Sequence, residues 1–290
     1  MNDPRAPHPR ASRTVKKIAI IPTLLTLGNG VCGFAAIAFA SKITPNNSDA
    51  ELFTLSAWLI IGAMLFDALD GYAARLAKTA SDFGGQLDSL CDAVSFGAAP
   101  AFLLLRLGLN WAETPFAKQS IAVIAALYMV CAILRLARFN VETSPDPLSH
   151  KRFKGLPSPA AAGCIVSLAL LRGEPVLRGG PTDSWLGVNA DLIRAVIDYW
   201  APAGTLVVAL LMVSRFPYPH LTNQLLRGRR RFSYVVQIVV VVFLIALFRE
   251  LAVVLSFWAY AISAPLGYGV RRLMRGTNVA PHPLDDQGRH

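Results

Sequence analysis

Charged side chains are scarce in this sequence: lysine, arginine, aspartate and glutamate make up only 16% of its 290 residues. Soluble domains usually carry about 25%. Hydrophobic residues reach 54% and the mean hydropathy is +0.45. This composition excludes a disordered chain, a nucleic-acid-binding tail and an ordinary soluble enzyme. It is typical of a polytopic membrane protein.

Cysteine and histidine are also rare, with four and five copies. The cysteines all fall inside apolar stretches and form no C-x-x-C pair, which argues against a disulfide framework and a zinc site. The histidines lie in tails or loops without metal-ligand spacing. The sequence contains no tandem repeat and no second soluble domain, so we expect one membrane domain.

Runs of about 20 apolar residues are long enough to cross the hydrocarbon core of a bilayer. The predicted fold is therefore an all-α transmembrane bundle of about eight spans. We place the spans at 19–40, 53–74, 85–105, 119–137, 157–171, 194–213, 233–248 and 251–269. Only Arg249 and Glu250 separate the last two, which favours a tight hairpin over one bent helix. A basic arm (1–17) precedes the membrane domain (18–270), and a tail (271–290) follows it.

The positions of the basic residues predict the orientation of these spans. If the N-terminus lies inside, 21 of the 28 lysines and arginines fall in inner segments. Such a bias is the positive-inside signal of membrane proteins. It places both termini in the cytoplasm and accounts for the net charge of +10 without nucleic acid. We therefore expect an integral protein of the cytoplasmic (inner) membrane.

Four aspartates interrupt the second and third predicted spans. Asp67 and Asp70 are three residues apart and Asp88 and Asp92 are four apart, so each pair shares one helix face. Both pairs lie toward the cytoplasmic ends of antiparallel helices, so the four carboxylates should converge. Carboxylates held together in a membrane remain ionised only if cations neutralise them. All-oxygen ligands suit hard cations such as Mg²⁺, Mn²⁺ or Ca²⁺.

Two other interpretations of these aspartates exist. In the first, they only pair with arginines such as Arg75 and hold the bundle together, although buried charge is a poor source of stability. Alternatively, they line the path of a cation or proton transporter. A transporter predicts carboxylates near the midplane with access from both faces, whereas these cluster toward the inner side.

Small residues accompany the aspartates on the same helix faces. Gly71, Ala74 and Gly84 leave room for a bulky ligand to approach the backbone closely. Arg75 is able to bind phosphate oxygens. Carboxylates, small residues and an arginine together indicate a metal-bound pyrophosphate.

Residues 67–92 read D-x-x-D-G-x-x-A-R-x8-G-x3-D-x3-D. The residues that fill this pattern are Asp67, Asp70, Gly71, Ala74, Arg75, Gly84, Asp88 and Asp92. The pattern resembles the signature of the CDP-alcohol phosphatidyltransferases. That resemblance implies a homodimeric membrane enzyme with a six-helix core, in which an alcohol displaces CMP from a CDP-linked lipid.

The resemblance also implies roles for these residues. Asp67, Asp70 and Asp88 would bind two divalent cations, Mg²⁺ or Mn²⁺. Asp92 would be the general base and also touch a metal. The two glycines, the alanine and the arginine would cradle the cytidine diphosphate.

Four other segments extend the resemblance over most of residues 18–220. They are I-P-T-L-L-T-L-G-N-G (21–30), R-L-A-R-F-N (135–140), K-G-L-P-S-P-A (154–160) and M-V-S-R (212–215), which is followed by Phe216-Pro217-Tyr218. Together they are similar to one branch of the family, the membrane-type phosphatidylserine synthases. The implied substrates are CDP-diacylglycerol and L-serine; glycerol 3-phosphate, inositol phosphate and choline are the alternative acceptors.

Several basic or polar residues in these segments are candidates for substrate binding. Arg135, Arg138 and Lys154 are suited to the serine carboxylate or the lipid phosphate, although the predicted topology alone also explains inner basic residues. The first span has Pro22-Thr23 where many relatives have Pro-Asn, and Asn29 is available one to two turns later for the nucleotide.

The charge bias gives a testable topology. Both termini and segments 75–84 and 139–156 should face the cytoplasm. In a variant without native cysteines, a cysteine at Lys78 or Lys151 should react only with reagents that reach the cytoplasm. Labelling of either position from the outside alone would contradict the layout.

Overall fold

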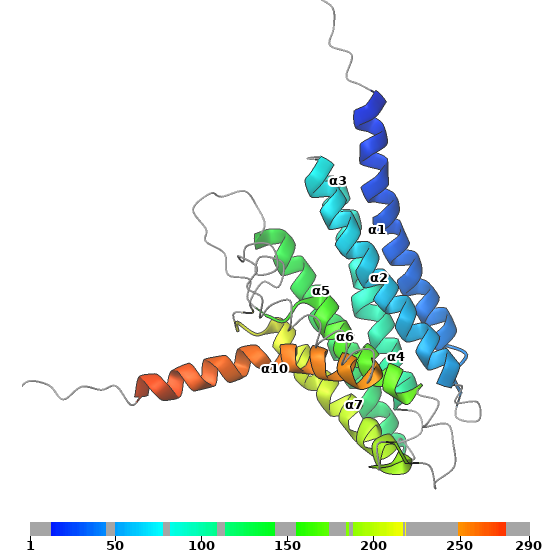
Figure 1. Cartoon of the computed structure of the whole chain (residues 1–290), viewed down its shortest axis with the longest axis vertical. Coiled ribbons are helices and arrows are strands. Elements are labelled where there is room, and N and C mark those ends of the chain that lie inside the picture. The colour runs from blue at the N-terminus through cyan, green and yellow to red at the C-terminus, as the bar shows by residue number, and fades with distance from the viewer. Residues whose placement is uncertain are drawn as a thin grey trace, which may run out of the picture.

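The computed structural model describes residues 13–44, 50–77, 82–108, 114–142, 155–173, 184–185, 188–216, 218 and 249–276. Its elements are α1 (Arg13–Ala40), α2 (Ala50–Ala77), α3 (Asp82–Asp92), the π-helical turn η1 (Ala93–Ala98), α4 (Ala99–Leu107), α5 (Pro115–Glu142), α6 (Ser158–Arg172), β1 (Ser184–Trp185), β2 (Val188–Asn189), α7 (Ala190–Val213) and α10 (Arg249–Gly276). The two strands form a short antiparallel pair, with Ser184 opposite Asn189. The prediction of an all-α bundle is confirmed, since everything else in these elements is helical (Figure 1).

Five helical segments in the described part of the chain are long and apolar enough to cross a membrane: Ile20–Ala40, Ala50–Ala73, Phe83–Leu107, Pro115–Val141 and Leu192–Val213. They match five of the eight predicted spans. The predicted span 157–171 corresponds to the shorter α6, and 233–248 lies outside the described residues. The predicted span 251–269 falls within α10, which continues to Gly276 and so extends into the segment expected to be the tail.

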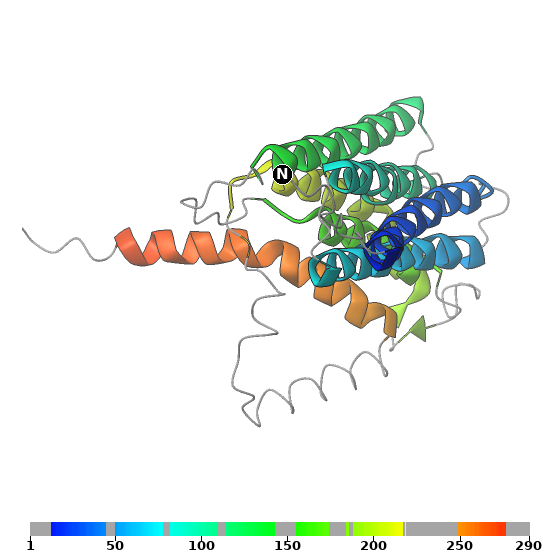
Figure 2. The same cartoon turned by 90° about the horizontal axis from the view of Figure 1, so that it is seen from above.

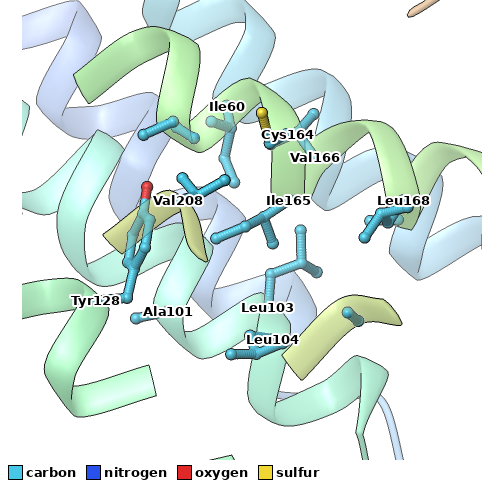
Figure 3. Close-up of a cluster of buried hydrophobic side chains, with 14 of the residues drawn as sticks. Ile60, Ala101, Leu103, Leu104, Tyr128, Cys164, Ile165, Val166, Leu168 and Val208 are labelled. Carbon is cyan, nitrogen blue, oxygen red and sulfur yellow. The ribbon is translucent and has the colours of Figure 1, made fainter. Parts of the chain in front are cut away.

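α6 lies at the centre of the bundle. It has 15 residues and is therefore about 22 Å long, less than the hydrocarbon thickness of about 30 Å. Twelve of its residues are buried, which fits a helix that is apolar on every side. Figure 3 shows Ile165, Val166 and Leu168 of α6 beside Leu103 and Leu104 of α4. The other helices pack around this core.

The third predicted span is not one regular α-helix. η1 separates α3 from α4 directly after Asp92. Such turns contain one surplus residue and occur often at functional sites. Two hydrogen bonds join it to other helices: the Tyr128 hydroxyl of α5 donates to the Phe96 carbonyl (2.9 Å), and the Ser95 hydroxyl of η1 donates to the Asn29 carbonyl of α1 (2.9 Å). η1 is thereby tied to α5 and α1.

Glycines bring α1 very close to the neighbouring helices. A Cβ atom on Gly33 would lie 2.4 Å from Ser95 Oγ and 2.6 Å from Ser95 Cα, and one on Gly30 would lie 3.0 Å from Cys91 Sγ. Helices with small residues at an interface approach each other closely in membranes. The G-N-G-V-C-G stretch (28–33) therefore lets α1 contact the span that carries Asp88 and Asp92.

α10 runs in a different direction from the spans. In both views it crosses the bundle, and its C-terminal end extends away from the other helices (Figures 1 and 2). Its first half packs on α6, where a Cβ atom on Gly163 would lie 2.1 Å from the Phe257 ring. Gly163 therefore packs α6 against α10.

The contact of α1 with η1 can be tested at Gly33. Gly33→Ala should lower the free energy of unfolding by about 1–3 kcal/mol, because the new methyl group meets the backbone of Ser95. Thermal unfolding in detergent would measure the loss. Gly62→Ala is the matched control, since its Cβ atom would come no closer than 3.9 Å to a neighbouring atom, Cys32 Sγ. Equal stability of the two variants would contradict the close packing.

Candidate active site

α2 and α3 bring three carboxylates together. One ligand oxygen each from Asp67, Asp70 and Asp88 lies within 4.8 Å of the others. Asp70 is buried, and Asp67 and Asp88 are partly buried. Asp92 lies one turn beyond Asp88 and is buried, but it is not part of this oxygen cluster. Three of the four aspartates that were predicted to converge thus lie together in the described part of the chain.

α1 contributes two polar side chains to the aspartates. Asn29 Nδ2 donates to Asp92 Oδ1 over 2.8 Å. Thr26 Oγ1 lies 2.8 Å from Asp70 Oδ2 and 3.0 Å from the Pro22 carbonyl, so its single proton serves one of them at a time. Thr26 and Asn29 are three residues apart and share a helix face. α1 therefore holds one carboxylate from each of the two aspartate-bearing helices.

These contacts change what was expected of α1. Asn29 was predicted to contact the nucleotide, and in the structure its amide contacts Asp92. Its Oδ1 atom is buried without a hydrogen-bond partner among the described residues and is free to accept one from a ligand. Thr26 was missed altogether. Its signal in the sequence was a polar side chain one turn before Asn29, on the same helix face, in a mostly apolar span.

The donor set fits a hard cation. Asp88 Oδ1 is buried and has no hydrogen-bond partner among the described residues, a costly state for a carboxylate oxygen. Within those residues no lysine or arginine forms an ion pair with Asp67, Asp70 or Asp88. A divalent ion would satisfy the orphaned oxygen and cancel the mutual repulsion. Asp67, Asp70 and Asp88 are thus arranged so that they are able to hold a metal ion.

Two of the segments that the sequence analysis singled out meet beside the aspartates. Arg135, in R-L-A-R-F-N, donates through Nη1 to the hydroxyl of Ser158, in K-G-L-P-S-P-A. The guanidinium of Arg135 also interacts electrostatically with Asp67 and Asp92. Asn140, the last residue of the first segment, donates through Nδ2 to Ser89 Oγ on α3 (2.8 Å). These contacts hold the C-terminal end of α5 against α3 and α6.

The remaining predicted site residues are described less fully. Gly71 follows Asp70 on α2, and Gly84 lies one turn before Asp88 on α3. The backbones of Ala74 and Arg75 belong to α2, but their side chains lie outside the described residues. Arg138 lies one turn beyond Arg135 and is partly buried. Lys154 is outside the described residues, so its role stays a prediction.

The chain is similar to known proteins over most of its length. The model of the CDP-alcohol phosphatidyltransferase family matches residues 19–207. A protein from Helicobacter pylori strain J99 is 31% identical over 209 residues, which cover 71% of this chain and 74% of that protein. A protein from Methanocaldococcus jannaschii is 33% identical over 213 residues, covering 73% and 80%.

A third relative, from Bacillus subtilis strain 168, is 34% identical over 201 residues, which cover 69% of this chain and 90% of the relative. All three relatives bear the name CDP-diacylglycerol–serine O-phosphatidyltransferase. The matched segment of the family model includes every aspartate of the cluster and the Arg135–Ser158 contact.

Cation binding can be tested without measuring any reaction. Mg²⁺ or Mn²⁺ should raise the unfolding temperature of the protein, because a ligand at one hundred times its Kd stabilises a fold by about 2.7 kcal/mol. Asp88→Asn should abolish this rise and should itself be more stable than wild type in chelator, since one repelling charge is gone.

Glu51→Gln, in the first turn of α2, is the control that should keep the cation effect. An undiminished effect in Asp88→Asn would show that the ion binds elsewhere.

Proposed function

Because this chain belongs to the CDP-alcohol phosphatidyltransferase family, we propose that it transfers the phosphatidyl group of CDP-diacylglycerol to L-serine and releases CMP. The observation that carries the proposal is the aspartate cluster of α2 and α3, which lies inside the family segment of an integral membrane protein. Relatives of this name at about one third identity support serine as the acceptor. The aspartates no longer favour a transporter, because membership of this enzyme family explains why they are present.

Asp92 is the proposed general base. Its Oδ1 atom accepts the Asn29 amide, which fixes the carboxylate and leaves Oδ2 to take a proton. In the reaction, Oδ2 removes the proton of the serine hydroxyl. The serine oxygen then bonds to the phosphorus that carries diacylglycerol, and the bond from that phosphorus to the bridging oxygen of CMP breaks. Phosphatidylserine and CMP result.

The pyrophosphate of CDP-diacylglycerol would lie over the other three aspartates. Two divalent cations, Mg²⁺ or Mn²⁺, held by Asp67, Asp70 and Asp88 with Asp92 in contact, would supply the positive charge that the pyrophosphate needs. Gly71 and Gly84 leave room for the nucleotide to approach α2 and α3. Ala74 and Arg75, one turn further along α2, complete the proposed cradle, and the buried Asn29 Oδ1 offers it an acceptor.

The serine acceptor brings a carboxylate that needs a cationic partner. Arg135 is the best placed, because its guanidinium interacts with Asp92 and is oriented by the Ser158 hydroxyl. Arg138, one turn away, and Lys154 are the further candidates for this carboxylate or for the lipid phosphate. A charge-assisted hydrogen bond of this kind contributes about 1.5–3 kcal/mol.

The position of the protein in the cell is proposed on the same grounds. The bias of basic residues favours the cytoplasmic membrane, with the active site and both termini facing the cytoplasm. The lipid tails of the substrate then stay in the bilayer while serine arrives from water. The family resemblance further suggests a homodimer.

An acceptor panel tests the proposal. Purified protein with CDP-diacylglycerol and Mg²⁺ or Mn²⁺ should release CMP with L-serine, but not with glycerol 3-phosphate, inositol phosphate or choline. Asp92→Asn should reduce kcat by about 10²–10⁴-fold, because it removes the base. Its KM for CDP-diacylglycerol should change little.

Release of CMP with glycerol 3-phosphate and none with serine would refute serine as the acceptor and leave the family assignment in place. Wild-type activity of Asp92→Asn would refute the assigned base.

A further inference from the structure

Asn29 of α1 uses both its side chain and its backbone to bind the third span. Its side-chain amide donates to Asp92 Oδ1 over 2.8 Å, and its carbonyl accepts the hydroxyl of Ser95 over 2.9 Å. Asp92 is the last residue of α3 and Ser95 belongs to η1, so one residue of α1 bridges the junction between these two elements. Both bonds are buried, since Asn29 and Ser95 are 0% exposed and Asp92 is 8% exposed.

The Ser95 hydroxyl is enclosed at this junction. A Cβ atom on Gly33 would lie 2.4 Å from Ser95 Oγ, so the hydroxyl occupies space that only a glycine leaves open. Gly33 is four residues beyond Asn29 and lies on the same face of α1. From α5, the Tyr128 hydroxyl donates to the carbonyl of Phe96, the residue after Ser95. The position of Ser95 is therefore fixed relative to both α1 and α5.

The bond from Ser95 fixes the place from which the Asn29 amide reaches Asp92. Helices in a bilayer gain little from hydrophobic contact with one another, so close packing and polar bonds set their register. The asparagine side chain is short, and a shift of its backbone along the third span therefore moves its amide by a similar amount. Hydrogen bonds weaken steeply when their length or angle departs from the optimum. A general base whose orientation is lost is less effective.

Thr26, the other polar contact from α1, serves a different part of the site. Its Oγ1 atom lies 2.8 Å from Asp70 Oδ2, and Asp70 is a member of the three-carboxylate cluster. Asp92 is not a member of that cluster. One contact of α1 thus supports a proposed cation ligand and the other supports the proposed base, so their effects are separable by experiment.

We infer that Ser95 is a positioning residue of the reaction: its hydroxyl, bonded to the Asn29 carbonyl, fixes the register of α1 so that the Asn29 amide holds Asp92 ready for the acceptor hydroxyl. This inference rests on the proposed function, in which Asp92 is the base. Ser95 acts through Asn29 and does not touch the reacting atoms itself.

The first test measures CMP release by the full-length protein. Ser95→Ala should lower kcat about fivefold, as expected for the loss of one ordinary hydrogen bond, and should leave both substrate KM values as in wild type. Ser95→Cys keeps a weak donor of similar size and should recover part of the loss. Ser167→Ala is the matched control with wild-type kcat, because Ser167 is also 0% exposed but donates to the Cys164 carbonyl within α6. A rise in both KM values with unchanged kcat would overturn the inference.

A second measurement uses the cation and no substrate. Thr26→Val should raise the Mn²⁺ concentration that gives half of the cation-induced rise in unfolding temperature, because it removes the bond to Asp70. Ser95→Ala should leave this concentration as in wild type. An equal shift in the two variants would show that Ser95 supports the whole site and not the base, and would contradict the inference.

A double variant tests the route through Asn29. Asn29→Ala keeps the backbone carbonyl but removes the amide that holds Asp92. In this background Ser95→Ala should cause no further fall in kcat, since the two residues act in series on one carboxylate. A further fall of the same size as in wild type would mean that Ser95 affects the rate by another route, and the inference would be wrong.

Asp92→Asn and the acceptor panel separate this inference from the proposed function. If Asp92→Asn is impaired and Ser95→Ala has wild-type kcat, the inference fails and the function stands. If Asp92→Asn matches wild type, the assigned base and the inference fail together. If wild type uses another of the four acceptors, the same variants are assayed with it: a fall in kcat that depends on Asn29 supports the inference, and an unchanged kcat overturns it. A protein that uses none of the four would overturn both.

Discussion

Repulsion among carboxylates inside a membrane bundle is the constraint on which the rest of this structure depends. Asp67, Asp70 and Asp88 converge with their ligand oxygens within 4.8 Å, in buried or partly buried positions where water screens them less than in solution. Folding must hold them together without a covalent link, so α2 and α3 need support from outside. α1 gives it through one hydrogen bond to each helix. The remaining unsatisfied oxygen, Oδ1 of Asp88, matches the need of a hard cation.

The close approach of α1 depends on residues that carry no chemistry themselves. Gly30 and Gly33 bring the backbone of α1 against the third span, and the Asn29 carbonyl then reaches Ser95 while its side chain reaches Asp92. A larger residue at either glycine would push α1 outward and lengthen both bonds. The hydrogen bonds of Asn29 to Asp92 and Ser95 therefore depend on the close packing that the two glycines allow.

The sequence predicts the parts of the site that follow helical periodicity. Spacings of three and four identify the aspartate faces, and long apolar runs identify the five long spans. Contacts between distant segments were not predictable in this way: the Arg135–Ser158 bond joins residues 23 apart, and Thr26 reaches Asp70 across 44. The direction of α10 was also missed, because apolar length gives no crossing angle. α6 was predicted as a span, but only packing reveals that it is buried on nearly every side.

η1 sets the angular relation between the two halves of the third span. An α-helix turns by about 100° per residue, so one surplus residue rotates everything beyond it by that amount relative to a regular helix. α3 can therefore direct Asp88 and Asp92 toward α1 and α2 while α4 independently directs Leu103 and Leu104 into the core around α6. This one turn therefore changes which side of the bundle each half of the span faces. Two faces that no uninterrupted helix could present together are matched to two different neighbours, and a change of one residue in length here would mismatch one half or the other.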